Sequence, residues 1–154
     1  MMNPAQTILV VDDSENDLLL LESALQQADF GVRVQKAYDG TQAIAYLKGE
    51  GQYSDRLQYP MPAAVLLDLN MPKKDGFDVL VWRRTRPELK SIPIVILTAS
   101  LRMEDVERSA DLGAQSYLVK PASLRELISM LRCLGDWLRI NHYPPHNPWV
   151  NTRR

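Results

Sequence analysis

The sequence predicts an α/β protein with a doubly wound, five-stranded parallel sheet in the strand order 2-1-3-4-5. Short apolar runs alternate along the chain with longer amphipathic segments, a pattern that implies right-handed crossovers between parallel strands. Two of the runs are almost wholly apolar, as strands covered by helices on both faces should be. The chain of 154 residues suits one domain with a substantial core.

Local signals place the individual elements. Strands are expected at residues 7–11, 32–37, 63–67, 92–97 and 116–119. Helices are expected from a capping box at Ser14 and Asp17 to Ala28, and at about 41–48, 77–86, 102–112 and 124–140. Gly113 is a plausible left-handed cap after the fourth helix, and Ser123 with Glu126 forms a capping box for the fifth.

Domain organisation is simple. We expect one domain at 5–141 and a proline-rich tail at 142–154, because proline cannot continue the last helix. The connection at 49–62 is long for a link between a helix and a strand. No internal repeat and no second domain is evident.

Composition narrows the class of protein. The net charge of −1 gives no reason to expect a nucleic-acid or membrane partner. The one cysteine, Cys133, cannot form a disulfide within the chain, and the N-terminus lacks the apolar segment of a signal peptide. We therefore expect a cytoplasmic protein.

Acidic side chains follow two of the strands that the predicted order makes neighbours. Asp12 and Asp13 follow the first strand and Asp68 the third, while Thr98 and Lys120 follow the fourth and fifth. Because ligands bind outside the carboxyl ends of parallel strands where the strand order reverses, these side chains should converge there. Any one of them alone would be an ordinary turn former or strand end; the ordered set indicates a site.

Electrostatics indicates what this site holds. Two carboxylates 4 Å apart repel by about 4 kcal/mol at an effective dielectric constant of 20, so a cluster of three requires a cation. Hard oxygen ligands suit Mg²⁺. We expect Asp12 and Asp13 to hold Mg²⁺ beside Asp68, and Asp68 to attack a phosphoryl group as a nucleophile. Lys120 then offers a positive charge, and Thr98 a hydroxyl, to the phosphoryl oxygens.

The motifs "VVDDSEND", "LLDLNMPKKDGFDVL", "IPIVILTAS" and "GAQSYLVKP" resemble those of the receiver domains of two-component response regulators. The resemblance extends over about residues 5–140 and implies the flavodoxin-like receiver fold. It implies that Asp68 is the phosphoacceptor, Asp13 a direct and Asp12 a water-mediated metal ligand, and the backbone carbonyl of Asn70 a further ligand. Such a protein is a phosphoryl acceptor for a histidine kinase rather than an enzyme, with slow autodephosphorylation at most.

The resemblance also implies a conformational switch. Thr98 would move toward the phosphoryl group and the ring of Tyr117 would turn inward, while Lys120 and Pro121 would be joined by a cis peptide bond. The fourth helix suits a mobile role, because its inward stripe of Met103, Val106 and Ala110 is thin.

Output should pass through protein contacts. In the fifth helix, a broad apolar face is expected to meet the sheet: Leu124, Leu127, Ile128, Leu131, Leu134 and Leu138. A second stripe of Met130, Cys133 and Trp137 favours a homodimer through the fourth helix, fifth strand and fifth helix. The long 49–62 loop and Trp149 are similar to those of response regulators paired with phytochrome-type histidine kinases.

Other functions fit the residues less well. A haloacid-dehalogenase-like phosphatase needs a second aspartate two residues after its nucleophile, where this chain has Asn70. A flavodoxin-like electron carrier would need a loop that accepts phosphate, which Asp12 and Asp13 would repel. A phosphorelay intermediate stays open as an alternative, and a scaffold that has lost phosphorylation is disfavoured by the intact set of side chains.

Overall fold

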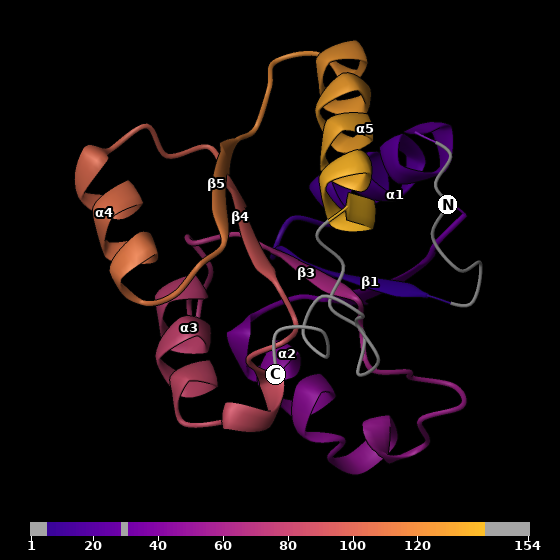
Figure 1. Cartoon of the computed structure of the whole chain (residues 1–154), viewed down its shortest axis with the longest axis vertical. Helices are drawn as coiled ribbons and strands as arrows, with labels where there is room; N and C mark the ends of the chain where they lie inside the picture. The colour runs from indigo at the N-terminus through magenta and orange to yellow at the C-terminus, as the bar shows by residue number, and fades with distance from the viewer. Residues whose placement is uncertain (1–5, 29–30, 141–154) are drawn as a thin grey trace.

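Five parallel strands form one sheet in the order β2-β1-β3-β4-β5, which confirms the predicted topology (Figure 1). The computed structural model describes residues 6–28 and 31–140, so the predicted tail at 142–154 lies outside the described residues. The strands are β1 (Thr7–Val11), β2 (Arg33–Ala37), β3 (Ala64–Leu67), β4 (Ile94–Thr98) and β5 (Ser116–Val119). Each lies within two residues of its predicted bounds.

Helices cover both faces of the sheet, α1 and α5 on one face and α2 and α3 on the other (Figure 1). The helices are α1 (Glu15–Ala28), α2 (Gly40–Lys48), α3 (Gly76–Arg84), α4 (Met103–Asp111) and α5 (Leu124–Ile140). Two short 3₁₀ helices, η1 (Gly51–Ser54) and η2 (Pro87–Leu89), lie in the connections before β3 and β4. Gly113 follows α4 with a positive φ of 95°, as predicted.

Alternate strand residues divide the core into two layers. Ile8 and Val10 pack with α1 and α5, whereas Leu9 and Val11 pack with α2 and α3. This is the two-residue period of a strand buried on both faces. Because β1, β3 and β4 are buried along their whole length, the polar residues that follow them are held on a rigid base.

The predicted apolar face of α5 is largely confirmed. Leu127, Leu131, Leu134 and Leu138 are buried against the sheet and α1. Leu124 is different: it is 39% exposed, because it lies in the first turn, beyond the edge of the layer that the later leucines fill.

The predicted inward stripe of α4 is wrong in its residues. Met103 is 65% exposed and Ala110 is also exposed, while Val106 is half-buried. The buried residue is Ser109, whose hydroxyl can face the protein because it donates to the carbonyl of Asp105 (2.7 Å). α4 thus has little apolar contact, as the sequence indicated, and its mobile role stays a prediction.

The long 49–62 connection is tied to α2 by aromatic rings and one arginine. The rings of Tyr46, Tyr53 and Tyr59 lie with their centroids 5.1–6.0 Å apart. Arg56 donates to the carbonyls of Tyr46 (2.8 Å) and Leu47 (2.9 Å), which satisfies acceptors at the C-terminal end of α2. The loop therefore has its own packed structure beside the sheet.

Replacing Tyr46 with phenylalanine should expose a stability contribution that depends on pH. The Tyr46 hydroxyl is buried and donates to the carbonyl of Pro60 (2.7 Å), so its loss should cost about 1 kcal/mol at pH 8. Burial raises the pKa of Tyr46 to about 12, against an ordinary value of 10.0. Between these values the unfolded chain binds fewer protons than the folded one, so the free energy of unfolding falls as the pH rises.

Urea unfolding of wild type and Tyr46→Phe at pH 8, 10 and 11.5 measures this effect. The difference in unfolding free energy should be constant below pH 10 and should narrow above it. Tyr59→Phe is the control, because the Tyr59 hydroxyl makes no hydrogen bond within the described residues. A difference between wild type and Tyr46→Phe that stays unchanged up to pH 11.5 would contradict the prediction.

Candidate functional site

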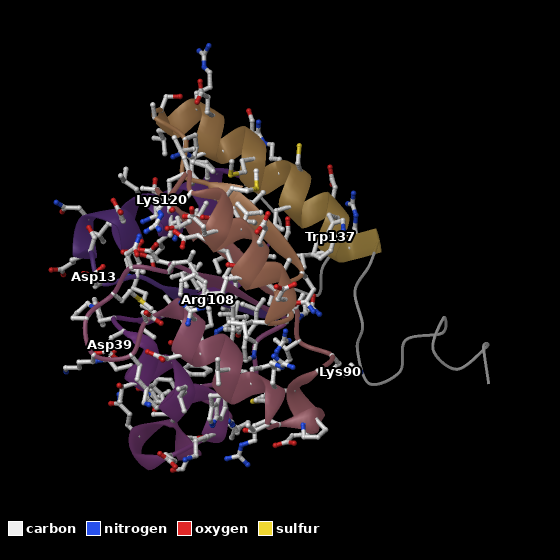
Figure 2. The ribbon with its side chains drawn as sticks, turned by 90° about the vertical axis from the view of Figure 1, so that its left-hand side faces the viewer. Asp13, Asp39, Lys90, Arg108, Lys120 and Trp137 are labelled. Carbon is white, nitrogen blue, oxygen red and sulfur yellow. The ribbon has the colours of Figure 1, made fainter. Side chains whose placement is uncertain are left out.

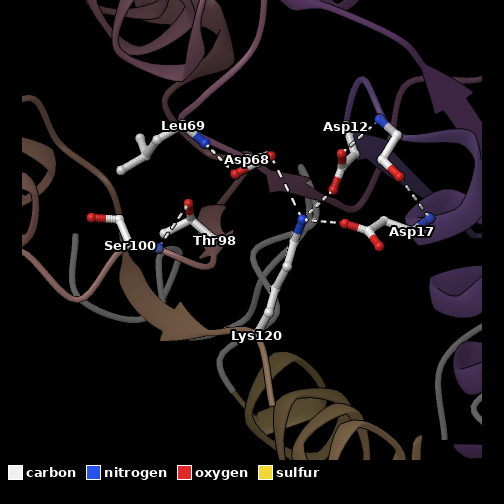
Figure 3. A network of polar contacts seen from close by, with 8 residues as sticks. Asp12, Asp17, Asp68, Leu69, Thr98, Ser100 and Lys120 are labelled. Atoms are coloured by element: carbon white, nitrogen blue, oxygen red, sulfur yellow. Dashed lines mark hydrogen bonds and ion pairs between the residues drawn. The ribbon is translucent and has the colours of Figure 1, made fainter. Parts of the chain in front are cut away.

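The residues after four strands meet at one edge of the sheet (Figure 3). Asp12 and Asp68 follow β1 and β3 and are only 1% and 6% exposed, while Asp13 is exposed. Carboxylate oxygens of these three residues lie within 4.8 Å of one another. The sequence prediction that the acidic side chains converge is therefore confirmed.

Lys120 is the cation that faces this cluster. Its ammonium group lies 2.5 Å from Asp12 Oδ2 and 3.6 Å from Asp68 Oδ2, and the side chain is 19% exposed (Figure 3). Burial lowers the pKa of Lys120, but its hydrogen bonds to Asp12 and Asp17 and the charge of Asp68 outweigh burial and raise that pKa above its ordinary value. Lys120 therefore stays charged at neutral pH.

The two oxygens of Asp68 have different surroundings. Oδ1 accepts a hydrogen bond from the backbone amide of Leu69 (2.8 Å), which fixes the carboxylate plane, while Oδ2 faces Lys120. Gly76, the first residue of α3, lies against the backbone of Asp68. A Cβ at position 76 would lie 2.4 Å from the Asp68 carbonyl oxygen, so only glycine lets α3 begin this close to the acceptor strand.

Asp17 belongs to the site, which the sequence analysis did not predict. The expected capping box is half formed: the Ser14 hydroxyl accepts from the Asp17 amide (3.2 Å), but the Asp17 carboxylate turns away to Lys120 (2.8 Å). The Ser14 amide, which a full capping box would pair with the Asp17 carboxylate, donates to Asp12 Oδ1 instead (2.9 Å). The sequence feature that could have indicated this role is the position of Asp17, which lies one helical turn beyond the Asp12–Asp13 pair, on the face of α1 that meets the strand ends.

Burial raises the pKa of Asp12, although the hydrogen bonds from Lys120 and the Ser14 amide oppose that shift. A buried acid of this kind gains from any further positive charge nearby. Within the described residues, the Lys120 ammonium group pairs with Asp12, Asp17 and Asp68, and Asp13 adds a fourth carboxylate beside Asp12 and Asp68, so the site carries excess negative charge.

Ser100 connects the predicted switch residues. Thr98 is fully buried, and its hydroxyl oxygen accepts weakly from the Ser100 amide (3.5 Å). The hydroxyl of Tyr117, on β5, donates to the Ser100 carbonyl (3.0 Å), and the Ser100 hydroxyl donates to Asp105 of α4 (2.5 Å). The segment after β4 thus joins Thr98, β5 and α4 in one set of hydrogen bonds.

One expectation at this edge is wrong. No peptide bond among the described residues is cis, so Lys120 and Pro121 are joined by a trans bond. The two isomers of a bond before proline differ by only about 1 kcal/mol, so local sequence does not decide between them. Asn70 lies in the exposed loop after Asp68, and the role of its carbonyl stays a prediction.

The donor set suits a hard divalent cation. It consists of carboxylate oxygens, and two of the three acids are buried. In the described part of the chain, the ammonium group of Lys120 alone pairs with the cluster, which leaves negative charge to neutralise. Asp13 is exposed at the open side of the cluster, from which an ion can approach. A buried acidic cluster on a doubly wound sheet, with a lysine and a threonine at neighbouring strand ends, defines a phosphoryl-acceptor type of site.

Comparison with known proteins identifies the family. Residues 8–132 match the response regulator receiver domain, and the chain belongs to this family. It is similar to the response regulator Rcp1 of Synechocystis sp., with 38% identity over 137 residues, which cover 88% of this chain and 91% of Rcp1.

Solved structures agree. The phosphorylated cyanobacterial phytochrome response regulator RcpA matches with a TM-score of 0.79 and 35% identity, over 86% of this chain and 93% of RcpA. The Mn²⁺-bound form of Rcp1 matches with a TM-score of 0.74 and 37% identity, over 84% of this chain and 91% of Rcp1. The bacteriophytochrome response regulator RtBRR matches with a TM-score of 0.70 and 38% identity, over 82% of this chain and 76% of RtBRR.

The chain is thus a receiver domain of two-component signalling, similar to phytochrome response regulators. Receiver domains bind a divalent metal at this acidic cluster and have histidine kinases as partners. Among the described residues, no helix is both long enough and apolar enough to span a membrane.

Proposed function

We propose that Asp68 accepts a phosphoryl group from a histidine kinase, with Mg²⁺ held by Asp12, Asp13, Asp68 and the Asn70 carbonyl. The observation that carries this proposal is the geometry of Asp68: one oxygen is fixed by the Leu69 amide and the other faces the charged Lys120. Asp68 is buried, yet it lies beside the exposed Asp13, where the site opens to a partner.

The transfer needs little chemistry from the chain itself. An oxygen of Asp68 forms a bond to phosphorus as the phosphorus–nitrogen bond of a phosphohistidine breaks, and the electron pair leaves with the imidazole. Lys120 stabilises the negative phosphoryl oxygens, and the Thr98 hydroxyl donates to one of them once it turns from Ser100. A bound Mg²⁺ would supply charge neutralisation during the transfer.

The proposed partner is a phytochrome-type histidine kinase, and the proposed place of action is the cytoplasm. The support is the similarity to response regulators of phytochrome systems. The chain would act as an acceptor rather than an enzyme, with only slow loss of the phosphoryl group. The phosphatase alternative is not favoured, because position 70 is asparagine and cannot act as a general acid.

Incubation of the chain with acetyl phosphate tests this proposal. Intact mass should increase by one phosphoryl group with Mg²⁺ present and stay unchanged with EDTA. Fragmentation should place the group on the peptide that contains Asp68. Addition at another residue, or rapid turnover of phosphomonoesters without a stable adduct, would reject the proposal.

We further propose that Thr98 and Tyr117 form the switch. Movement of Thr98 toward the phosphoryl group would break its weak contact with the Ser100 amide and disturb the bonds from Ser100 to Tyr117 and Asp105. Since α4 has little apolar packing, these bonds form a large share of what fixes its N-terminal end. The change at Asp68 would thereby reach α4 and β5.

The proposed output surface is a homodimer through α4, β5 and α5. β5 is an edge strand of the sheet, with α5 on one side and α4 on the other (Figure 1). The predicted second stripe of α5 lines a cavity of about 260 Å³ together with Leu118: Met130 and Trp137 are half-buried, and Cys133 is exposed. An apolar hollow beside an edge strand suits a symmetric contact.

Sedimentation velocity should show more dimer after addition of Mg²⁺ and beryllofluoride, a phosphoryl analogue. Cys133→Glu places a charge in the apolar hollow and should shift the dimer dissociation constant upward about tenfold or more. Gln26→Glu adds the same negative charge on the exposed side of α1, outside the proposed interface, and should leave the dimer dissociation constant unchanged. A monomer at high concentration with and without the analogue would refute the dimer.

Amide NMR spectra with and without the same analogue test the switch. Unchanged spectra for α4 and β5 would refute it.

A further inference from the structure

A cavity of about 500 Å³ opens at the edge of the sheet opposite Asp68, between the C-terminal ends of α3 and α4. Figure 2 places Lys90, one of its lining residues, on the side of the molecule away from Asp13 and Lys120. Four cationic side chains line the cavity: Arg83, Arg84, Arg86 and Lys90. Pro87 and Leu112 provide apolar wall, and Asp111 is the one acid among the lining residues.

Arg83 brings a buried charge to this cavity. It is 7% exposed, and its guanidinium donates to the carbonyls of Ile92 (2.9 Å) and Gly113 (2.6 Å). These bonds join α3 to the segments before β4 and β5, but they do not neutralise the charge. No carboxylate lies within ion-pair distance of Arg83 in the described part of the chain, and burial lowers the pKa of its guanidinium. Buried charges in proteins are normally paired.

The other three cations of the cavity have few interactions that would compete with a bound anion. Arg84 and Lys90 are exposed and make no side-chain hydrogen bond or ion pair within residues 6–28 and 31–140. Arg86 is only loosely paired, with Glu88 at 3.7 Å, and stacks over Trp82. Among the lining residues, four cations against Asp111 give a charge of +3, which Glu88 at the rim offsets only in part, in a chain whose net charge is −1.

We propose that this cavity binds a small phosphate-bearing anion with two or more negative charges. Arginine forks match phosphate oxygens in pairs, and Arg83 uses only part of its five N–H donors on carbonyls. A phosphate group offers three or more acceptor oxygens to converging donors, whereas a carboxylate offers two. The volume lies within the usual range of small-ligand sites, and the apolar wall leaves room for the non-phosphate part of an ester.

Titration with sodium pyrophosphate, followed by amide NMR at constant ionic strength and pH 7.5, tests this proposal. EDTA is included so that no metal at the acidic cluster captures the probe. Saturable shifts are expected at Lys90, Leu112 and Gly113. Arg84→Gln and Lys90→Gln should each weaken binding about tenfold, because each removes one charge-assisted contact. Arg125→Gln, an equal charge change on the exposed side of α5, should leave binding unchanged.

Three results would overturn the assignment. Shifts that grow linearly without saturation, or equal weakening by Arg125→Gln, would show only general charge screening. Saturable shifts confined to other residues would place the anion elsewhere. A hexaglutamate peptide that shifts the same amides at lower concentration than pyrophosphate would assign the cavity to an acidic peptide and not to phosphate.

Discussion

Asp68→Asn should abolish phosphoryl transfer to the chain and at the same time make the metal-free protein more stable. The amide cannot act as the attacking carboxylate, so intact mass should show no adduct with acetyl phosphate and Mg²⁺. The substitution also removes one of three carboxylates whose oxygens lie within 4.8 Å of one another. Relief of this repulsion should raise the free energy of unfolding by about 1 kcal/mol in EDTA.

In the presence of Mg²⁺, wild type should become more stable than Asp68→Asn, the reverse of the order expected in EDTA. A ligand that binds only the folded state stabilises it according to its concentration and affinity, and Asp68→Asn removes one ligand of the proposed Mg²⁺ site. Urea unfolding in EDTA and in millimolar Mg²⁺ measures both effects. Glu107→Gln, the same chemical change at an exposed position, should alter neither phosphorylation nor the response to metal. An adduct on Asp68→Asn, or equal stabilisation of both proteins by Mg²⁺, would contradict the assignment.

The convergence of the acidic residues could be predicted because it depends only on topology. Residues that follow neighbouring parallel strands share one edge of the sheet, so Asp12 and Asp68 had to lie close together once the strand order was inferred. Lys120 follows β5 at the same edge, with β4 between β5 and β3, and its long side chain reaches both carboxylates. The apolar runs determine which strands are central, and the central strands carry the site.

Features that depend on side-chain rotamers or on small free-energy differences were not predictable in this way. Asp17 had two plausible roles, as a helix cap or as a partner of Lys120, and only the direction of α1 relative to β5 decides between them. The face that α4 turns inward was mispredicted because its few apolar residues specify its rotation weakly, and the hydrogen-bonded Ser109 took the buried position. The anion cavity was missed because its four cations lie in one stretch, residues 83–90, which by itself is typical of a solvated surface, and only the fold brings the opposite wall at 111–115 against it.

Lys120→Met should destabilise the metal-free protein strongly, and the size of the loss should depend on metal. Lys120 is the one cation hydrogen-bonded to Asp12 within the described residues, and the Asp12 side chain is 2% exposed. Removing one partner of a buried ion pair leaves the other charge unpaired, at a cost of about 3–5 kcal/mol. Mg²⁺ should recover much of this loss, because a cation bound by Asp12 and Asp13 replaces the missing positive charge.

Lys36→Met provides a matched comparison, because Lys36 pairs with Glu22 at 3.3 Å on the surface, where such a pair contributes at most about 1 kcal/mol. Urea unfolding of both variants with EDTA and with Mg²⁺ distinguishes the loss of a buried positive charge from the loss of an exposed one. Mg²⁺ should raise the free energy of unfolding of Lys120→Met by more than it raises that of wild type, and Lys36→Met should respond to Mg²⁺ as wild type does. Its rate of adduct formation with acetyl phosphate should also fall at least about 100-fold, because the phosphoryl oxygens lose their positive partner. If Lys120→Met cost no more than Lys36→Met in EDTA, the acidic cluster would have to be neutralised by solvent or protons, and the electrostatic reason for a divalent ion at Asp12, Asp13 and Asp68 would fail.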